Sequence, residues 1–273
     1  MVSLSDEAYR QIRQFFFSQS GIDLTHNKRH LVEGRLRQRV QALGFSCYGQ
    51  YFAHAMQSHN SAERQLLIDT LTTNETYFFR EPQHFKLFAE HIVAHLPHGA
   101  RVWCAAASSG EEPYSLAMLL ADKLAHGAWQ IVATDLSKRM IERAEQGLYL
   151  MQRLELMPER YLKRFCQRGT GAYEGYFKVR QEVRERVEFR LHNLLHSPHA
   201  LGRFEVIVLR NVLIYFNQST KQQVLEQVLK QLKPGGWLII GHAESLHGLR
   251  LPLVQIAPSV FRLPSASAVD GRL

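Results

Sequence analysis

The stretch RVWCAAASSGEEPYSLAM, from Arg101 to Met118, decides the fold of this 273-residue chain. Arg101 to Ala107 is an apolar, strand-like run, and a turn of small residues, SSGEEP, leads into a helix expected from Tyr114 to Ala125. In an open α/β sheet, such a unit binds ligands at the carboxyl end of its strand. The stretch therefore predicts a ligand site between the strand and the helix.

Strands and helices continue to alternate along the rest of the chain. A helix capped by Ser137 is expected, and another from Gln218 to Leu232, before Pro234-Gly235-Gly236 turns the chain. Short apolar strands that alternate with helices indicate an α/β fold with a mostly parallel sheet. The further strands are expected at Gln130 to Thr134, Val187 to Leu191, Phe204 to Leu209 and Trp237 to Ile240.

The first seventy-odd residues show helical periodicity and no useful β-alternation, which predicts a small all-helical domain. The first helix is expected after Ser5-Asp6-Glu7 and is ended by Gly21. The others are expected at about Lys28 to Leu43, Tyr48 to Gln57 and Ala62 to Thr70.

A stretch of different composition runs from about Gln146 to Arg186. It contains a helix from Pro158 to Phe165, and then the glycines Gly169, Gly171 and Gly175 separate short alternating runs. This pattern predicts a small hairpin subdomain inserted between the βαβ units.

Bulk properties limit the class of protein. A hydrophobic content of 45% allows a core without disulfides or metals, and a net charge of +8 favours a polyanionic partner, either nucleic acid or an acidic protein surface. Cys47, Cys104 and Cys166 lie far apart, and the histidines show no HExxH spacing, so no metal site is expected. The longest apolar runs are too short to span a bilayer, which predicts a soluble, cytoplasmic protein.

The turn after the first strand indicates the chemistry of the ligand. Gly110 is its one glycine, so the dinucleotide fingerprint G-x-G-x-x-G is absent. Glu111 and Glu112 would repel a pyrophosphate but suit a cationic or hydroxyl-rich ligand such as S-adenosylmethionine. The alternative is that both acids only complement the helix dipole.

Three further polar positions follow strands at the same edge of the sheet. Asp135 ends the second strand about 25 residues after Gly110, where an acid typically binds ribose hydroxyls, although it could instead cap a helix. Asn193 and the pair Arg210-Asn211 follow later strands, and an Asn side chain suits an adenine edge. Either Asn could equally be an ordinary loop residue.

Four motifs together resemble a known family, the chemotaxis receptor methyltransferases (CheR). The resemblance extends over nearly the whole chain, to about Leu263, and the four motifs occur in the right order. They are TTNETYFFRE (Thr72 to Glu81), AAASSGEEPYSLAM (Ala105 to Met118), RNVLIYF (Arg210 to Phe216) and LKPGGWLIIGHAES (Leu232 to Ser245).

The resemblance implies methyl transfer from S-adenosylmethionine to glutamate side chains of chemoreceptor cytoplasmic helices. The reaction gives glutamyl methyl esters and S-adenosylhomocysteine. The cofactor contacts it implies are Asn74, Thr76, Arg80, Glu112, Asp135, Asn193, Leu194, Arg210 and Asn211.

The resemblance also implies an organisation. A helical N-terminal domain (1–74) and a linker contributing to the cofactor site (75–96) precede a Rossmann-like methyltransferase domain (97–264) with a β-subdomain (about 147–187). The last residues (265–273) are polar and small, which predicts a disordered tail. In some members the β-subdomain docks a receptor's C-terminal pentapeptide, and the run Gly169 to Gly175 looks like that version. We expect a monomer that is recruited to membrane receptor arrays without inserting into the membrane.

The implied chemistry agrees with the residues present. A glutamate carboxylate is already ionised near neutral pH, so no general base is needed, and none of the motifs contains a His or Lys in that role. Exclusion of water and alignment of the groups should carry the catalysis. Arg80 is expected to bind a carboxylate of cofactor or substrate. Tyr215 and Phe216 either exclude water or belong to the core.

A basic helix offers a candidate surface for an acidic receptor helix. Arg35 and Arg39 are four residues apart and share a face, and Arg37 points elsewhere. With Gly169 and Gly171 they are the candidate substrate contacts, although such a stripe could simply be a solvated face.

Two other function classes compete with this interpretation. A nucleic-acid methyltransferase would fit the basic charge, but the [D/N/S]PP[Y/F] loop of enzymes that methylate base amines is replaced here by RNVLIY. A non-catalytic binding protein would fit the fold, but all the matched cofactor positions carry suitable residues.

Overall fold

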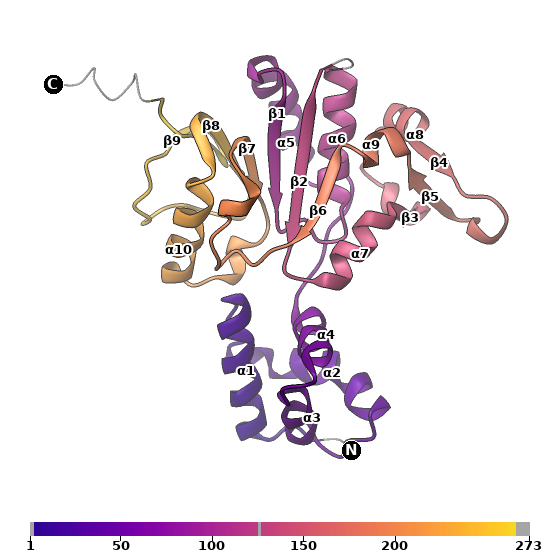
Figure 1. Cartoon of the computed structure of the whole chain (residues 1–273), viewed down its shortest axis with the longest axis vertical. Helices are drawn as coiled ribbons and strands as arrows, with labels where there is room; N and C mark the ends of the chain where they lie inside the picture. Colours follow the sequence, from indigo (N-terminus) through magenta and orange to yellow (C-terminus); the bar gives the residue numbers. More distant parts are fainter. Residues whose placement is uncertain (1–2, 125–126, 266–273) are drawn as a thin grey trace.

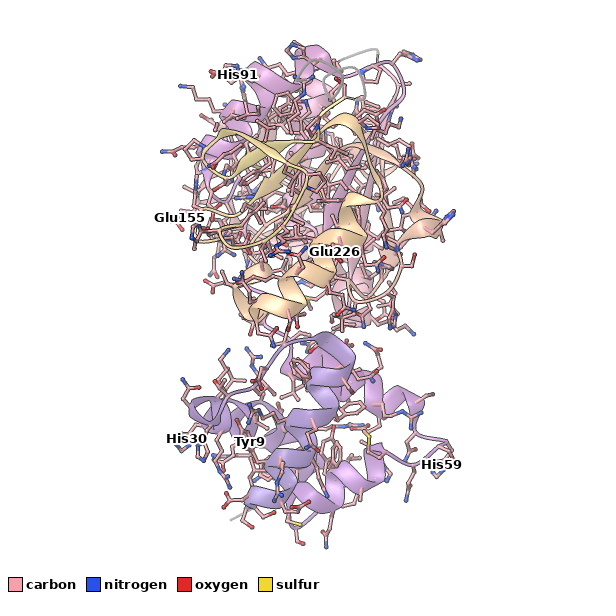
Figure 2. The ribbon with its side chains drawn as sticks, turned by 90° about the vertical axis from the view of Figure 1, so that its left-hand side faces the viewer. Tyr9, His30, His59, His91, Glu155 and Glu226 are labelled. Atoms are coloured by element: carbon pink, nitrogen blue, oxygen red, sulfur yellow. The ribbon has the colours of Figure 1, made fainter. Side chains whose placement is uncertain are left out.

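The computed structural model describes residues 3–124 and 127–265, which form a helical part and an α/β part (Figure 1). Figure 2 shows Tyr9 and His59 in the helical part and Glu226 in the α/β part. The tail from residue 266 lies outside the described residues, as does Ala125, the expected end of a helix. Within the described ranges, every helix is too short or too polar to cross a bilayer.

The helices of the helical part enclose a core of their own, as the sequence predicted. The Ser5 hydroxyl accepts the N–H of Ala8 at the start of the first helix, and Gly21 ends that helix with a φ of 72°. Ile12 and Leu36 are fully buried between the helices. The elements are α1 (Asp6–Ser20), η1 (His26–Lys28), α2 (Arg29–Ala42), α3 (Tyr48–Ala55) and α4 (Ser61–Leu71).

A seven-stranded sheet in the order β6-β2-β1-β7-β8-β10-β9 forms the centre of the α/β part. The first five strands in this order are parallel, and β10 and β9 are antiparallel additions at one edge. The strands are β1 (Ala100–Ala105), β2 (Trp129–Asp135), β6 (Val187–Leu191), β7 (Phe204–Leu209), β8 (Leu232–Ile240), β9 (Val254–Ala257) and β10 (Val260–Arg262).

The order of the strands positions the ligand site. The chain proceeds outward from β1 to β2 and β6, and then returns to the other side of β1 for β7 and β8. The loops that leave the carboxyl ends of β1 and β7 therefore diverge, and this switch point is where an open α/β sheet forms a crevice for a ligand.

Helices cover both faces of the sheet (Figure 1). Val102 and Trp103 are neighbours on β1 and point to opposite faces, where they join two separate hydrophobic cores. Met118 packs in the same core as Val102, and Leu225 packs in the same core as Trp103. The elements are α5 (Pro82–Leu87), its continuation η2 and η3 (Phe88–Ile92 and Val93–His95), α6 (Glu111–Lys123), α7 (Lys138–Gln146), η6 (His199–Leu201), η7 (Leu213–Tyr215) and α10 (Gln218–Leu229).

The inserted segment forms a small antiparallel sheet, β3-β5-β4, as the glycine-separated runs predicted. Gly169 begins the turn between β4 and β5, and a Cβ there would come within 2.0 Å of the Tyr173 carbonyl oxygen. The elements are β3 (Leu148–Leu150), η4 (Met151–Leu154), α8 (Glu159–Phe165), β4 (Cys166–Arg168), η5 (Gly171–Tyr173), β5 (Tyr176–Val179) and α9 (Gln181–Arg184).

Some features of the α/β part differ from the sequence-based expectation. Residues 82–95, β9 and β10 were not predicted as regular structure. The expected helix to Leu232 ends at Leu229, and Pro234-Gly235-Gly236 lies inside β8 instead of forming a turn before it. The Leu263 N–H donates to the Gly236 carbonyl, so the segment after β10 pairs with this irregular strand start.

Two glycine-to-alanine substitutions should change stability in opposite directions. Gly34 lies in the middle of α2 with no atom within 4 Å of a new Cβ, so Gly34→Ala should stabilise the protein by about 0.5–1 kcal/mol. A Cβ at Gly236 would come within 2.8 Å of the Lys233 carbonyl and 2.9 Å of the Glu205 carbonyl. Gly236→Ala should therefore destabilise it by roughly 1–3 kcal/mol.

Urea unfolding of both variants beside the unmodified protein measures the difference. Equal stability of the two variants would contradict the packing described for β8.

Candidate cofactor site

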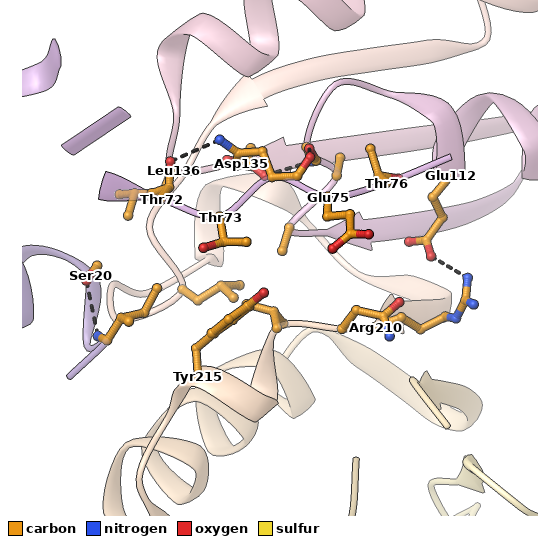
Figure 3. A pocket seen from close by; sticks show the side chains of 18 of the residues that line it. Ser20, Thr72, Thr73, Glu75, Thr76, Glu112, Asp135, Leu136, Arg210 and Tyr215 are labelled. Carbon is orange, nitrogen blue, oxygen red and sulfur yellow. Dashed lines mark hydrogen bonds and ion pairs between the residues drawn. The ribbon is translucent and has the colours of Figure 1, made fainter. Parts of the chain in front are cut away.

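A cavity lies at the carboxyl edge of the sheet, between the loops after β1, β2, β6 and β7 and the linker after α4. The space between these residues amounts to about 900 Å³ and is partly open to solvent. Figure 3 shows Tyr215 on one side of the cavity, Thr73 and Glu75 on the other, and the Glu112–Arg210 pair at one end.

The residues that the sequence singled out for a cofactor all lie at this cavity. They come from the linker, from the start of α6 and from the ends of three strands. They are Asn74, Thr76, Arg80, Glu112, Asp135, Asn193, Leu194, Arg210 and Asn211.

Small residues of the loop after β1, and not its glycine Gly110, border the cavity. Ala106 and Ser108 line the cavity and have φ values of 63° and 49°, which residues other than glycine rarely adopt. Gly110 faces away: a Cβ there would come within 2.8 Å of both the Ala144 Cβ and the Tyr149 hydroxyl. The glycine therefore allows packing against α7 and β3, and the small residues before it border the ligand space.

The two acids at the start of α6 point in different directions. Glu112 lines the cavity, and its Oε2 accepts a hydrogen bond from Arg210 Nη1 at 2.6 Å. Glu111 is fully buried, and its Oε2 accepts from the Ser109 hydroxyl at 2.7 Å. Burial raises the pKa of Glu111, and Arg153 lies 3.9 Å from its other oxygen. Of the two, Glu112 is thus the acid that can contact a ligand here.

Asp135 ties together the loops after β1 and β2. Its Oδ2 accepts from the Ser108 N–H at 2.8 Å, and its Oδ1 accepts from the Ser137 N–H at 2.9 Å. Burial raises the pKa of Asp135, and these backbone N–H groups oppose the rise. The capping of α7 falls to Ser137, whose hydroxyl accepts the Met140 N–H. Each oxygen of Asp135 keeps a second lone pair, which can accept from a ribose hydroxyl.

Arg210 is a buried guanidinium held by two carboxylates. Its Nη2 donates to Glu81 Oε2 at 2.9 Å and to the Arg80 carbonyl at 2.6 Å, while its Nη1 bonds to Glu112. Burial alone would lower the pKa of Arg210, but the two carboxylates outweigh it and raise the pKa. The positive charge of Arg210 is therefore neutralised inside the protein.

The side-chain amides of Asn193 and Asn211 both form hydrogen bonds within the protein. Asn211 has a φ of 58°, and its Nδ2 donates to Glu81 Oε1 at 3.0 Å. Asn193 Nδ2 donates to the Gln19 carbonyl at 2.6 Å, and its Oδ1 accepts from the Leu195 N–H. Each amide keeps one further N–H for a ligand, and Asn193 also ties the loop after β6 to the end of α1.

Arg80 differs from Arg210 in having no carboxylate partner in the described part of the chain. Its Nη1 donates to the Glu75 carbonyl at 2.7 Å, and its guanidinium lies 5.6 Å from the centre of the Tyr77 ring. It lines the cavity, so its remaining N–H groups can bind a carboxylate.

The basic stripe of α2 is engaged within the protein. Arg35 donates to the carbonyls of Leu71 and Thr72, and Arg39 forms a bidentate pair with Glu63. These contacts hold the linker against α2 and join α2 to α4. A substrate role for either arginine stays a prediction, and Arg37 is the exposed arginine of this segment.

Sequence reasoning missed part of the cavity lining. His192 carried a signal, because it directly precedes Asn193, and its Nε2 is buried without a hydrogen-bond partner. Burial lowers the pKa of His192, which keeps the ring neutral near pH 7. The other missed residues are Ser20, Ile22, Thr72, Thr73, Glu75, Leu136 and Val212; Tyr215 and Phe216 also line the cavity.

The ionisable groups of the cavity fit S-adenosylmethionine. Glu112, Asp135 and Glu75 are acids, and the charge of Arg210 is neutralised, so the cavity favours a cation with hydroxyl groups and disfavours a pyrophosphate. Arg80 adds one site for the carboxylate end of such a ligand.

Behind the cavity, Glu81, His84 and His242 bring possible metal-ligand atoms within 4.8 Å of one another. This group has no HExxH spacing, because His242 is distant in sequence from Glu81 and His84. Glu81 already accepts a hydrogen bond from the Arg210 guanidinium, which would repel a metal cation. We therefore interpret the group as part of the Arg210 network.

The parallel sheet with its switch point and an acid-lined cavity define a class: S-adenosylmethionine-dependent methyltransferases of the Rossmann-like type. The chain belongs to the CheR methyltransferase family. The family's all-alpha domain matches residues 7–72, and its SAM binding domain matches residues 74–258.

Named relatives match over most of their length. The chemotaxis protein methyltransferase of Salmonella typhimurium is 43% identical over 252 residues, which cover 91% of this chain and 87% of that protein. The protein of the same name from Escherichia coli is 41% identical, covering 96% and 92%. Chemotaxis protein methyltransferase 2 of Pseudomonas aeruginosa is 40% identical, covering 88% and 86%.

Asp135→Asn should weaken cofactor binding. One oxygen becomes an NH₂ group, which cannot accept from Ser108 or Ser137 or from a ribose hydroxyl. We expect S-adenosylhomocysteine to bind about tenfold or more weakly in isothermal titration calorimetry. Asp122→Asn, which removes a carboxylate that pairs with Arg164 away from the cavity, is the control. Unchanged affinity in a folded Asp135→Asn protein would argue against the ribose contact.

Proposed function

We propose that the chain transfers a methyl group from S-adenosylmethionine to glutamate side chains of chemoreceptor cytoplasmic domains, forming methyl esters during adaptation. Membership of the CheR family supports the reaction, and the names of the relatives support the chemotaxis setting. The observation that carries the proposal is that one cavity gathers nine residues from the linker, the start of α6 and the strand ends.

In this proposal the cofactor lies across the carboxyl edge of the sheet. Asp135 accepts from the ribose hydroxyls, and Asn193-Leu194 border the adenine. Glu112 and Arg210-Asn211 bound the end that carries the sulfonium, and Asn74, Thr76 and Arg80 close the cavity from the linker. The proposed organisation remains a helical domain at 1–74, a contributing linker at 75–96 and a methyltransferase domain at 97–264.

The protein's contribution to methyl transfer is alignment and exclusion of water. When bound, S-adenosylmethionine would supply its sulfonium methyl group to in-line attack by the acceptor carboxylate, which would give the methyl ester and S-adenosylhomocysteine. Opposite charges cancel along this path, so water would stabilise the reactants more than the transition state. The acceptor needs no general base. In this proposal Tyr215, which lines one side of the cavity, helps to exclude water, whereas Phe216 packs in the core that contains Trp103.

The receptor contacts of this proposal involve two surfaces. Turn residues Gly169 and Gly171 border the exposed Tyr173 on the β-subdomain, where a receptor's C-terminal pentapeptide would dock. The helical part, including Arg35 and Arg39, would face the methylated receptor helix. We propose that the enzyme acts as a monomer in the cytoplasm and is recruited to receptor arrays.

The reaction is tested by incubating the protein with methyl-labelled cofactor and a receptor cytoplasmic fragment. We expect label on the receptor that mild alkali releases as methanol, because esters hydrolyse and N-methyl groups do not. Replacing the acceptor glutamates by alanine should abolish the label. Alkali-stable label, or label on nucleic acid, would overturn the proposal, and so would the absence of label when a control enzyme works.

Arg80→Ala should reduce receptor methylation by about 100-fold, because the cavity loses its unpaired guanidinium and with it a bidentate carboxylate contact. Single-turnover rates at saturating receptor measure the effect. Arg203→Ala, which removes an exposed arginine away from the cavity, should leave the rate unchanged. If the two variants behaved alike, Arg80 would have no role in binding a carboxylate.

A further inference from the structure

Glu81 lies directly behind the cofactor cavity and does not line it. Its side chain is 17% exposed, and it follows Arg80 at the start of α5. The motif TTNETYFFRE ends at this residue. We infer that Glu81 is a positioning residue that holds Arg210-Asn211 in place. Because Glu81 also pairs with Arg210, it leaves part of the negative charge of Glu112 available to a ligand.

The contacts of Glu81 join three separate segments. Its Oε1 accepts from Asn211 Nδ2 at 3.0 Å, and its Oε2 accepts from Arg210 Nη2 at 2.9 Å. The same Oε2 accepts from the His242 N–H at 3.2 Å and lies 3.2 Å from His84 Nδ1. One carboxylate thus links α5, the loop after β7 and the loop after β8.

The backbone around Glu81 needs such contacts to keep its shape. Glu81 has a φ of 57°, and Asn211 has a φ of 58°, both in the left-handed region that side chains disfavour. Strained residues of this kind persist where surrounding contacts fix them. The Glu81–Asn211 hydrogen bond joins the two strained positions directly, so each restrains the other.

The charges give Glu81 an effect that packing alone would not. Glu81 and Glu112 share one guanidinium, so their charges exceed that of Arg210 when both carboxylates are ionised. Burial raises the pKa of Glu112, and the neighbouring Arg210 opposes that rise. Glu112 lines the cavity, and its Oε1 accepts no hydrogen bond within the described residues. Without the charge of Glu81, Arg210 would be paired with Glu112 alone, and the negative charge offered to a cationic ligand would disappear.

The cofactor and its product differ in the charge that would interact with the Glu81–Arg210–Glu112 group. S-adenosylmethionine carries a sulfonium, and S-adenosylhomocysteine carries a neutral thioether in its place. Glu81→Gln keeps the size of the side chain and removes its charge. We expect about tenfold weaker binding of S-adenosylmethionine and less than threefold weaker binding of S-adenosylhomocysteine in isothermal titration calorimetry.

A matched control removes the same charge from the opposite end of β7. Glu205 is 13% exposed and pairs with Lys233, and its Oε2 accepts the Arg101 N–H. Glu205→Gln should leave the ratio of the two affinities unchanged. Glu81→Asp keeps the charge and should also keep the ratio, even if both affinities fall, so it tests the inference should the Gln variant not fold.

If Glu81→Gln lost the same factor of affinity for S-adenosylmethionine and for S-adenosylhomocysteine, the role of Glu81 would be purely structural and the inference would be overturned. Unchanged affinity for both ligands would also overturn it. A changed ratio in Glu81→Asp would also overturn it. The inference rests on the proposed cofactor site, and its failure is distinguishable from failure of that site. If the proposed cofactor site is wrong, Asp135→Asn will bind S-adenosylhomocysteine with normal affinity. If only the role of Glu81 is wrong, Asp135→Asn will still bind it weakly.

Discussion

One buried guanidinium organises the functional end of the molecule. Arg210 is 5% exposed, and a charge at that depth has to be neutralised by fixed partners. Glu81 supplies one partner from the linker side and Glu112 the other from the start of α6. Removal of one partner from such a buried pair typically costs about 3–5 kcal/mol. The pair therefore holds the linker, α6 and the loop after β7 in one arrangement around the cavity.

The helical part completes the cavity that the sheet begins. Gly21 marks a close approach of the two parts, because a Cβ there would come within 2.9 Å of the Thr220 methyl group on α10. Arg35 fixes the linker to α2 through the carbonyls of Leu71 and Thr72, and Asn193 reaches the end of α1. A ligand at the carboxyl edge is thereby enclosed from two sides, which suits a reaction that depends on excluding water.

Local patterns in the sequence predicted most of the fold and the part of the candidate site that lies at the strand ends. The linker residues Asn74, Thr76 and Arg80 came from the family resemblance. Apolar runs gave the parallel strands, and the acid at Asp135 follows from its place at a strand end. Glu81 could not be found this way, because its role depends on contacts with Arg210 and Asn211, far along the chain. The sequence also did not show that Glu111 points away from the cavity. Glu111 and Glu112 are adjacent on α6, and which of two neighbouring side chains faces the cavity depends on how the helix is rotated about its axis. β9 and β10 escaped notice because both strands are short, and because the residues of β9 are largely exposed.

A crystal structure of the protein with S-adenosylhomocysteine tests the central claim most directly, namely that one cavity formed by the linker and the sheet holds the cofactor. We expect the ribose against Asp135, the thioether end near Glu112, and the linker residues Asn74 and Thr76 covering the ligand. The Glu81–Arg210–Glu112 contacts should persist in that structure. A ligand bound elsewhere, or one untouched by the linker, would contradict the account.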